Sequence, residues 1–444
     1  MTKRNNKHER RIKRFIVGTG LFTILLATST YAWFIGMKTV SVSPFDVKIA
    51  AIDSLSLSLN GADWSDTLEI NKANYDTASY EGNTNTWGGD GLIPMSSVGV
   101  IDNDSSRLIL YQKGSLTATP GGYRLMASQV KNNGEKEQEK GYVAFDLFIR
   151  NLSGEEYYEN NNPKNEEGIY LTPDSVVTVG AAGEKNTGIE NSVRVAFAQI
   201  GRVEATTEDA VTITGINCQG GGNVTPICNT LDEEDHTRTA TIWEPNDKDH
   251  VANAINWYTT SCKKRKSEGT DLTLPESYVL NGEGACTAIE NGTFYPTYAV
   301  GGEIKETDHV DVYDGTEYNG YTTSVSASPA KGKLYAFPTF TDTMKNKEGV
   351  ERPEFMTLAP NSITKVRVYI YIEGQDVDNY DFASLGKQIS VEFGLSKERF
   401  YDTDINYQGT PTLPDDVLKN KHQEDKTPKT KDENGEETPS PVEP

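Results

Sequence analysis

Apolar and polar residues alternate along several segments of the chain, with the period of two that a β-strand with one buried face requires. These segments are also rich in β-branched and aromatic residues, and Gly, Asn and Asp turns separate them. They are Phe45–Ile49, Leu55–Asn60, Tyr142–Arg150, Ser192–Ala198, Lys365–Ile372 and Gln388–Leu395. The pattern predicts an all-β fold, a β-sandwich of jelly-roll or immunoglobulin-like topology.

The strand-like segments gather in two parts of the chain, which suggests how it is divided. Residues 33–199 are expected to form the first part of the sandwich, and residues 331–400 its closing strands. Between them, residues 200–330 alternate poorly and hold every cysteine. We expect an irregular insertion or subdomain there, because its apolar content is thin for a core of its own. From 401 to 444 aromatic residues nearly vanish and Pro, Glu, Lys and Thr dominate, which predicts a disordered acidic tail.

The N-terminus has the pattern of an export signal. Met1–Arg14 contains seven Lys or Arg residues, Phe15–Gly36 contains no charged residue, and small residues lead to Ala32. A basic region, an apolar core and a small-x-small site predict a signal peptide, residues 1–32, cleaved between Ala32 and Trp33 by a signal peptidase. The alternative is an uncleaved membrane anchor that extends to about residue 36, with its basic flank in the cytoplasm. Either way, the body is predicted to be secreted or exposed on the cell surface.

The charge of the chain excludes one class of partner. The full chain has 43 basic and 65 acidic residues, and removal of residues 1–32 leaves 36 and 64, a net charge of −28. Nucleic-acid binding depends on clustered cations that displace counterions, so we expect no nucleic-acid partner. The one dense basic run is Lys263–Lys266, which is read either as a solvated loop or as a contact for an acidic neighbouring subunit.

The four cysteines lie within 69 residues, with gaps that do not suit a zinc site. Cys218, Cys228, Cys262 and Cys286 are separated by 9, 33 and 23 residues, without the short paired spacing that zinc ribbons use. In an exported chain an even number of cysteines indicates disulfides. Three connectivities exist, and we favour Cys218–Cys228 and Cys262–Cys286 because they close the shorter loops. Four reduced thiols remain the alternative in a host without oxidising machinery.

The search for catalytic and metal-binding motifs gives no candidate site. The histidines occur in no metalloprotease motif, and neither a nucleophile elbow nor a phosphate-binding loop is present. Acidic turns at Asp102–Asp104, Asp308–Asp314 and Glu373–Asn379 could supply oxygen ligands to calcium, but none matches the loop that calcium requires. Asp and Asn also favour turns for local reasons, which is the simpler reading. We expect no enzyme, no metal and no cofactor.

A resemblance rests on Ala27–Phe34, Lys38–Val42 and Phe45–Ala50, with a similar closing strand in Val366–Lys397. Together these resemble TasA/camelysin-type proteins, exported by Gram-positive bacteria and processed by a SipW-type signal peptidase. The resemblance covers about a quarter of the chain. It implies a jelly-roll sandwich that polymerises into biofilm-matrix fibres through the segment that signal cleavage releases. The length, the cysteines and the 200–330 region depart from that pattern.

The segment after the cleavage site is itself suited to assembly. Trp33–Ile49 is an apolar, alternating strand, with Val40, Val42, Phe45, Val47 and Ile49 as its candidate contact residues. Such a strand must find a sheet edge. It can pair within its own domain, or it can complete the sheet of a neighbour. We therefore expect a self-associating structural protein; the alternatives are a membrane-anchored adhesin or glycan-binding module, and a secreted hydrolase.

Overall fold

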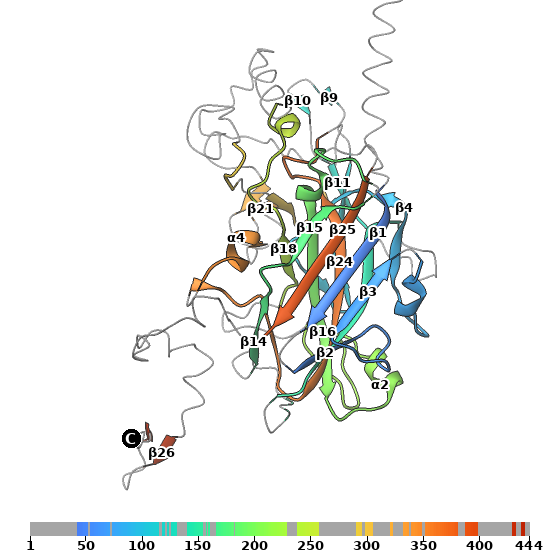
Figure 1. The fold of residues 1–444 in the computed structure, drawn as a ribbon, viewed down its shortest axis with the longest axis vertical. Coiled ribbons are helices and arrows are strands. Elements are labelled where there is room, and N and C mark those ends of the chain that lie inside the picture. The colour runs from blue at the N-terminus through green and yellow to red at the C-terminus, as the bar shows by residue number, and fades with distance from the viewer. Residues whose placement is uncertain are drawn as a thin grey trace, which may run out of the picture.

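The computed structural model describes most of the body between residues 42 and 397. The described residues are 42–51, 54–71, 73–114, 118–119, 122–123, 126–130, 140–153, 157, 159, 166–181, 183–228, 238–256, 290–294, 298–304, 320–322, 332–336, 339–348, 351–380, 387–397, 429–431 and 437–439. Strands dominate these residues and the few helices are short (Figure 1). The all-β prediction is confirmed.

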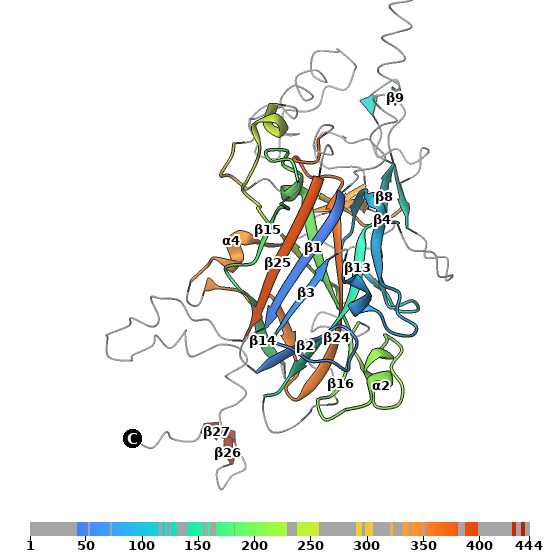
Figure 2. The ribbon, with the colours of Figure 1, turned by 45° about the vertical axis from the view of Figure 1, so that its right-hand side comes forward.

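The first sheet contains the strand that begins the described chain. Its strands follow the order β23-β14-β25-β1-β3, and β15 also pairs with β25. Their bounds are β1 (Val42–Ala51), β3 (Thr67–Asn71), β14 (Glu167–Leu171), β15 (Val176–Val179), β23 (Met356–Leu358) and β25 (Lys387–Ser396). β1 runs parallel to β25 and antiparallel to β3, and the two views of the ribbon show β1 between them (Figures 1 and 2).

The second sheet is built on three long antiparallel strands, with β24 (Ser362–Glu373) between β13 (Val143–Asn151) and β16 (Val193–Glu204). Shorter strands extend it, either beside β13 and β16 or beyond the end of β24. These are β2 (Leu55–Ser58), β4 (Thr86–Leu92), β5 (Pro94–Ser96), β8 (Tyr111–Gly114), β11 (Met126–Gln129), β12 (Lys140–Gly141), β17 (Thr225–Pro226), β18 (Thr241–Glu244) and β22 (Phe340–Thr341).

The two sheets face each other across the main hydrophobic core. One face of each long strand supplies it, for example Phe145 and Leu147 of β13 and Val366, Val368 and Ile370 of β24. The first sheet contributes its inward residues to the same cluster, namely Val47, Ile49, Ile70, Ile389, Val391, Phe393 and Leu395. The expected sandwich therefore arises from period-two patterns on strands far apart in the sequence.

The second sheet is buried on its other face as well, which the sequence pattern did not predict. Ala144, Phe148, Tyr369 and Tyr371 lie there in a second apolar cluster with residues from 95–110 and 198–242. As a result β13, β16 and β24 are buried almost throughout. The alternating polar residues of these strands were expected to face water; several are instead buried charges that need partners inside the protein.

The region 200–330 is not separate from the sandwich over its first part. The boundary expected at 199 falls inside β16, and β18 pairs with β16 in the second sheet. Cys218 and Cys228 form the disulfide that the spacing favoured, and both are buried in the outer cluster. Other described residues of this region, including Ile213 and Ile216, pack over the outer face of the second sheet. Cys262 and Cys286 lie outside the described residues.

The remaining elements are short. They are β6 (Ile101–Asp102), β7 (Arg107–Leu108), β9 (Ala118–Thr119), β10 (Gly122–Tyr123), β19 (Tyr298–Val300), β20 (Gly320–Thr322), β21 (Gly332–Ala336), the 3-10 helices η2 (Tyr75–Ala78) and η4 (Ile189–Ser192), and the α-helices α2 (Ala210–Thr214) and α4 (Asp342–Lys345). In the tail, where disorder was expected, β26 (Lys429–Lys431) and β27 (Glu437–Pro439) form an antiparallel pair.

Candidate functional site

The predicted assembly residues fall partly on β1. Ala32, Trp33 and Val40 lie outside the described residues, and Val42 and Phe45 are placed on β1 by their backbone. The side chains of Val47 and Ile49 are fully buried in the core between the sheets. Of the two alternatives left by the sequence, pairing within its own domain is the one the single chain adopts.

β1 is held by specific pairing on both sides. Phe45 to Ala51 pair in register with Ile389 to Leu395 of β25, and Asp46 to Ala50 pair with β3. A shift by one residue would turn Val47 and Ile49 outward, so the register is tightly specified. On the outer face, Lys48 Nζ lies 3.0 Å from Glu392 Oε1 in an exposed ion pair.

The free edge of β3 is capped by a side chain. The Asn71 amide donates to Asn74 Oδ1 over 2.7 Å, and Asn74 Nδ2 donates to the Glu69 carbonyl over 3.2 Å. The Thr67 amide donates to Ser65 Oγ. These backbone groups are therefore already engaged, so a strand added beside β3 would first have to displace Asn74.

A strained junction joins β1 to the rest of the chain. Ser54, which precedes β2, has a φ of 67°, in the left-handed region that residues other than glycine rarely adopt. Its carbonyl accepts a hydrogen bond from the Leu152 amide, at the end of β13. The chain passes from the first sheet to the second at this point.

The outer face of the first sheet carries a groove of about 440 Å³. Small residues, including Ala50 and Gly394, are among those that line it, as are Lys48 and Glu392. The lining also includes Thr67, Leu68, Glu69, Asp174, Ser175, Ile49 and Phe393. Phe393 is its one aromatic residue, and with 3% of its surface exposed it offers no face for stacking against a sugar.

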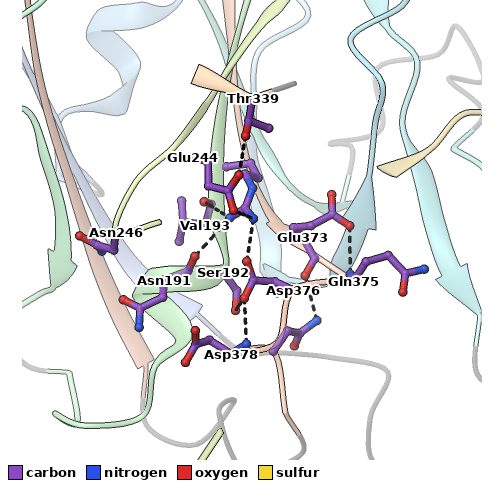
Figure 3. Close-up of polar contacts among 12 residues, drawn as sticks. Asn191, Ser192, Val193, Glu244, Asn246, Thr339, Glu373, Gln375, Asp376 and Asp378 are labelled. Carbon is purple, nitrogen blue, oxygen red and sulfur yellow. Dashed lines mark hydrogen bonds and ion pairs between the residues drawn. The ribbon is translucent and has the colours of Figure 1, made fainter. Parts of the chain in front are cut away.

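A second constellation, which sequence reasoning missed, is a buried ion-pair network at the end of β24 (Figure 3). Arg194 of β16 is 1% exposed and donates from Nη2 to Glu244 Oε1 and to Asp376 Oδ2, each over 2.6 Å. Its Nη1 donates to the carbonyls of Asn191 and Val193. The arginine thus joins β16, β18, η4 and the turn after β24.

The network extends from Asp376 to a buried histidine. The Asp378 amide donates to Asp376 Oδ1, and Asp378 Oδ2 lies 2.7 Å from His250 Nδ1. The sequence marked Glu373–Asn379 as an acidic turn with a calcium or a turn-forming role. In the structure its carboxylates contact Arg194, His250 and backbone amides. Among the residues described, no group of three or more His, Cys, Asp or Glu side chains is arranged to hold a metal ion.

Two buried carboxyl groups near Arg194 have raised pKa values. Burial raises the pKa of Glu373 to about 8, although Arg194 acts against the shift. Burial also raises the pKa of Glu244, despite Arg194. Because these pKa values lie above those of an unfolded chain, the folded state binds extra protons, and its stability falls as pH rises from about 4 to 8.

Two other buried carboxyl groups, those of Glu166 and Asp146, have lowered pKa values. Burial alone would raise the pKa of Glu166, but Arg238 and Arg202 lower it. Burial would likewise raise the pKa of Asp146, but Arg367 and Lys365 lower it. Both carboxylates stay ionised at neutral pH. Their contribution to stability is present above the ordinary carboxyl pKa and is lost as pH falls below it.

The chemistry of the buried network is that of a structural connection. Arg194 is saturated by carboxylates and carbonyls, and both ring nitrogens of His250 already have partners. Only the alternation of the sequence could have indicated Arg194, as a polar residue on a strand face that a second layer of chain covers.

No helix among the described residues is long and apolar enough to span a membrane; the apolar stretch Phe15–Gly36 lies outside them. In comparisons with known proteins, no family model, no curated protein and no solved structure matches this chain.

Proposed function

We propose that this protein is an exported structural protein of the cell surface or extracellular matrix that self-associates by exchanging its first strand, β1. The observation that carries the proposal is that β1 is paired along both edges, between β25 and β3, and buries Val47 and Ile49 in the core. With cleavage after Ala32, only residues 33–41 precede β1, so this strand can leave its position between β25 and β3 without threading a long chain. An identical strand from a neighbour can then restore every pairing it made.

Exchange is favoured over simple addition at the edge. Asn74 occupies backbone groups of β3, so the slot between β25 and β3 is the better acceptor. The export segment ends close before β1, so retention of that segment in a membrane would restrain the strand until cleavage. The resemblance to TasA/camelysin-type proteins points to the same class of function.

A disulfide trap tests the exchange directly. Lys48 and Glu392 are register partners on the exposed face of β1 and β25. In the double variant Lys48→Cys with Glu392→Cys, oxidation of exchanged material should link neighbouring chains. A ladder of covalent oligomers should then appear on a non-reducing denaturing gel, whereas unexchanged protein should give only a monomer band.

The controls separate exchange from other forms of association. Each single variant, oxidised in parallel, should give no ladder beyond dimers. If light scattering shows oligomers but the oxidised double variant gives only the monomer band, exchange is contradicted and the association uses another interface. A protein that stays monomeric at every concentration would overturn the polymerising function itself.

Export is tested on the protein recovered from the cell surface or culture fluid. N-terminal sequencing is expected to begin at Trp33, because Ala32 closes the small-residue site. An intact Met1 in a membrane fraction would instead support an anchored protein. An intact Met1 in the cytoplasmic fraction alone would contradict export.

The two alternatives have weaker support. A glycan-binding function would use stacking surfaces, and the groove on the first sheet is lined by small and charged residues with its one aromatic side chain buried. A hydrolase would use a pair of accessible carboxyl groups, and the carboxylates Glu244 and Asp376 are bound to Arg194. We therefore retain the structural function as the proposal.

A further inference from the structure

His250 joins three parts of the chain through three hydrogen bonds. Its backbone amide donates to Asn291 Oδ1 over 2.8 Å. Its ring Nδ1 lies 2.7 Å from Asp378 Oδ2, and its ring Nε2 lies 3.0 Å from the Thr293 carbonyl oxygen. Gly292 also donates to the Lys248 carbonyl over 2.7 Å. The segments 246–256 and 290–294 are thus fastened to each other and to the turn after β24.

The partners of the imidazole determine how many protons the hydrogen-bonded row of Asp378, His250 and Thr293 must hold. A carbonyl oxygen can only accept, so Nε2 must carry a proton. The contact between Nδ1 and Asp378 needs a second proton, which either the ring or the carboxyl group can carry. An imidazolium with a carboxylate and a neutral imidazole with a carboxylic acid both satisfy this requirement. The row from Asp378 through His250 to Thr293 therefore requires two protons in either form.

We propose that His250 is a proton-dependent latch, which fastens residues 290–294 to the body when the row holds two protons and releases them when one is lost. The remaining proton stays on Nδ1, because a hydrogen bond to a carboxylate is stronger than one to a neutral carbonyl. Nε2 then presents a lone pair to the carbonyl oxygen of Thr293. Two acceptors at hydrogen-bonding distance repel each other, so this contact opens while the Asp378 contact remains.

The surrounding charges place the release above the ordinary histidine pKa. Burial alone would lower the pKa of His250, but the hydrogen bond and charge of Asp378 raise it above its ordinary value. Burial raises the pKa of Asp378 to about 6, and Asp376 adds to this effect. The Val251 amide faces Asp378 Oδ1, and Arg194 balances Asp376. The latch is complete below the ordinary histidine pKa of about 6.5 and is lost as pH rises through the higher value in the folded protein.

The test must be local, because Glu373 titrates in the same range and changes global stability. Purified protein labelled with ¹⁵N in its histidines is titrated from pH 5.5 to 9.5, and the protonation of the His250 Nε2 is followed by NMR. Exchange of the Gly292 amide, which bridges the two segments, is measured across the same range. We expect Nε2 to lose its proton above pH 6.5. Over the same range, the hydrogen-exchange rate of the Gly292 amide should rise at least tenfold more than its intrinsic pH dependence predicts.

Two variants complete the experiment. In His250→Gln the extra rise in Gly292 exchange should disappear, whereas His422→Gln, in the tail, should behave as the parent chain does. An Nε2 that stays protonated to pH 9.5 would overturn the proposal. So would Gly292 exchange that follows only its chemical rate while Nε2 titrates. If His250→Gln fails to fold, these two measurements on the parent protein still decide the matter.

Discussion

A chain that begins at Ser54, and therefore lacks β1, is expected to lose most of its folding free energy. Val47 and Ile49 are fully buried in the core, and burial of each such side chain contributes about 1.5–3 kcal/mol. The truncation also removes the pairing partner of β25 and β3. Typical domains are stable by only about 5–15 kcal/mol, so denaturant unfolding should show a much lower midpoint or no cooperative transition.

A synthetic peptide covering residues 38–51, added to the truncated chain, should restore the transition. Exchange requires that the slot accept β1 from outside its own chain, and the peptide imitates this. A peptide with Val47→Asp should fail, because it would bury an unpaired charge. A matched peptide with Lys48→Thr, changed on the exposed outer face, should still act.

Two results would contradict this picture. If the truncated chain keeps the full unfolding free energy, β1 contributes nothing to the core and its buried position is wrong. If the truncated chain is unstable but the peptide never restores it, the slot does not accept an external strand. The second result would overturn strand exchange while leaving the fold intact.

Replacement of Arg194 by methionine is expected to be the most destabilising single substitution in the buried network. The side chain keeps a similar length but loses its charge, which leaves Glu244 and Asp376 buried without their cation. Removal of one partner from a buried ion pair typically costs about 3–5 kcal/mol. The free energy of unfolding, measured by denaturant titration at pH 7, should fall by about that amount.

The pH dependence and a control identify the cause. Without Arg194 the pKa of Glu244 should rise further, so the variant should be less impaired at pH 5 than at pH 8. Lys48→Met removes the cation of an exposed pair and should change stability little. A triple variant, Arg194→Met with Glu244→Gln and Asp376→Asn, should recover part of the loss. An unfolding free energy that Arg194→Met leaves unchanged would contradict the role given to this residue.

The sequence alone determined the long strands of the two sheets, because period-two alternation is local. Lys365–Ile372 and Gln388–Leu395 were predicted within a few residues of β24 and β25. The pairing of Cys218 with Cys228 was also predicted, since neighbouring cysteines close the shorter loop. The alternation on β1 showed that Val47 and Ile49 share one face and need a sheet to cover it.

Only the tertiary structure decided which sheet covers β1 and what lies over the second sheet. Alternation states that one face is polar, but it does not reveal whether water or another layer of chain lies against that face. Arg194 and Asp146 therefore looked like exposed strand residues, and the covering role of 200–242 looked like an insertion. The contacts of His250 and of Arg194 with the turn after β24 join residues more than 120 positions apart. No local pattern encodes such pairs, because the strands and turns that carry them meet only when the sheets pack.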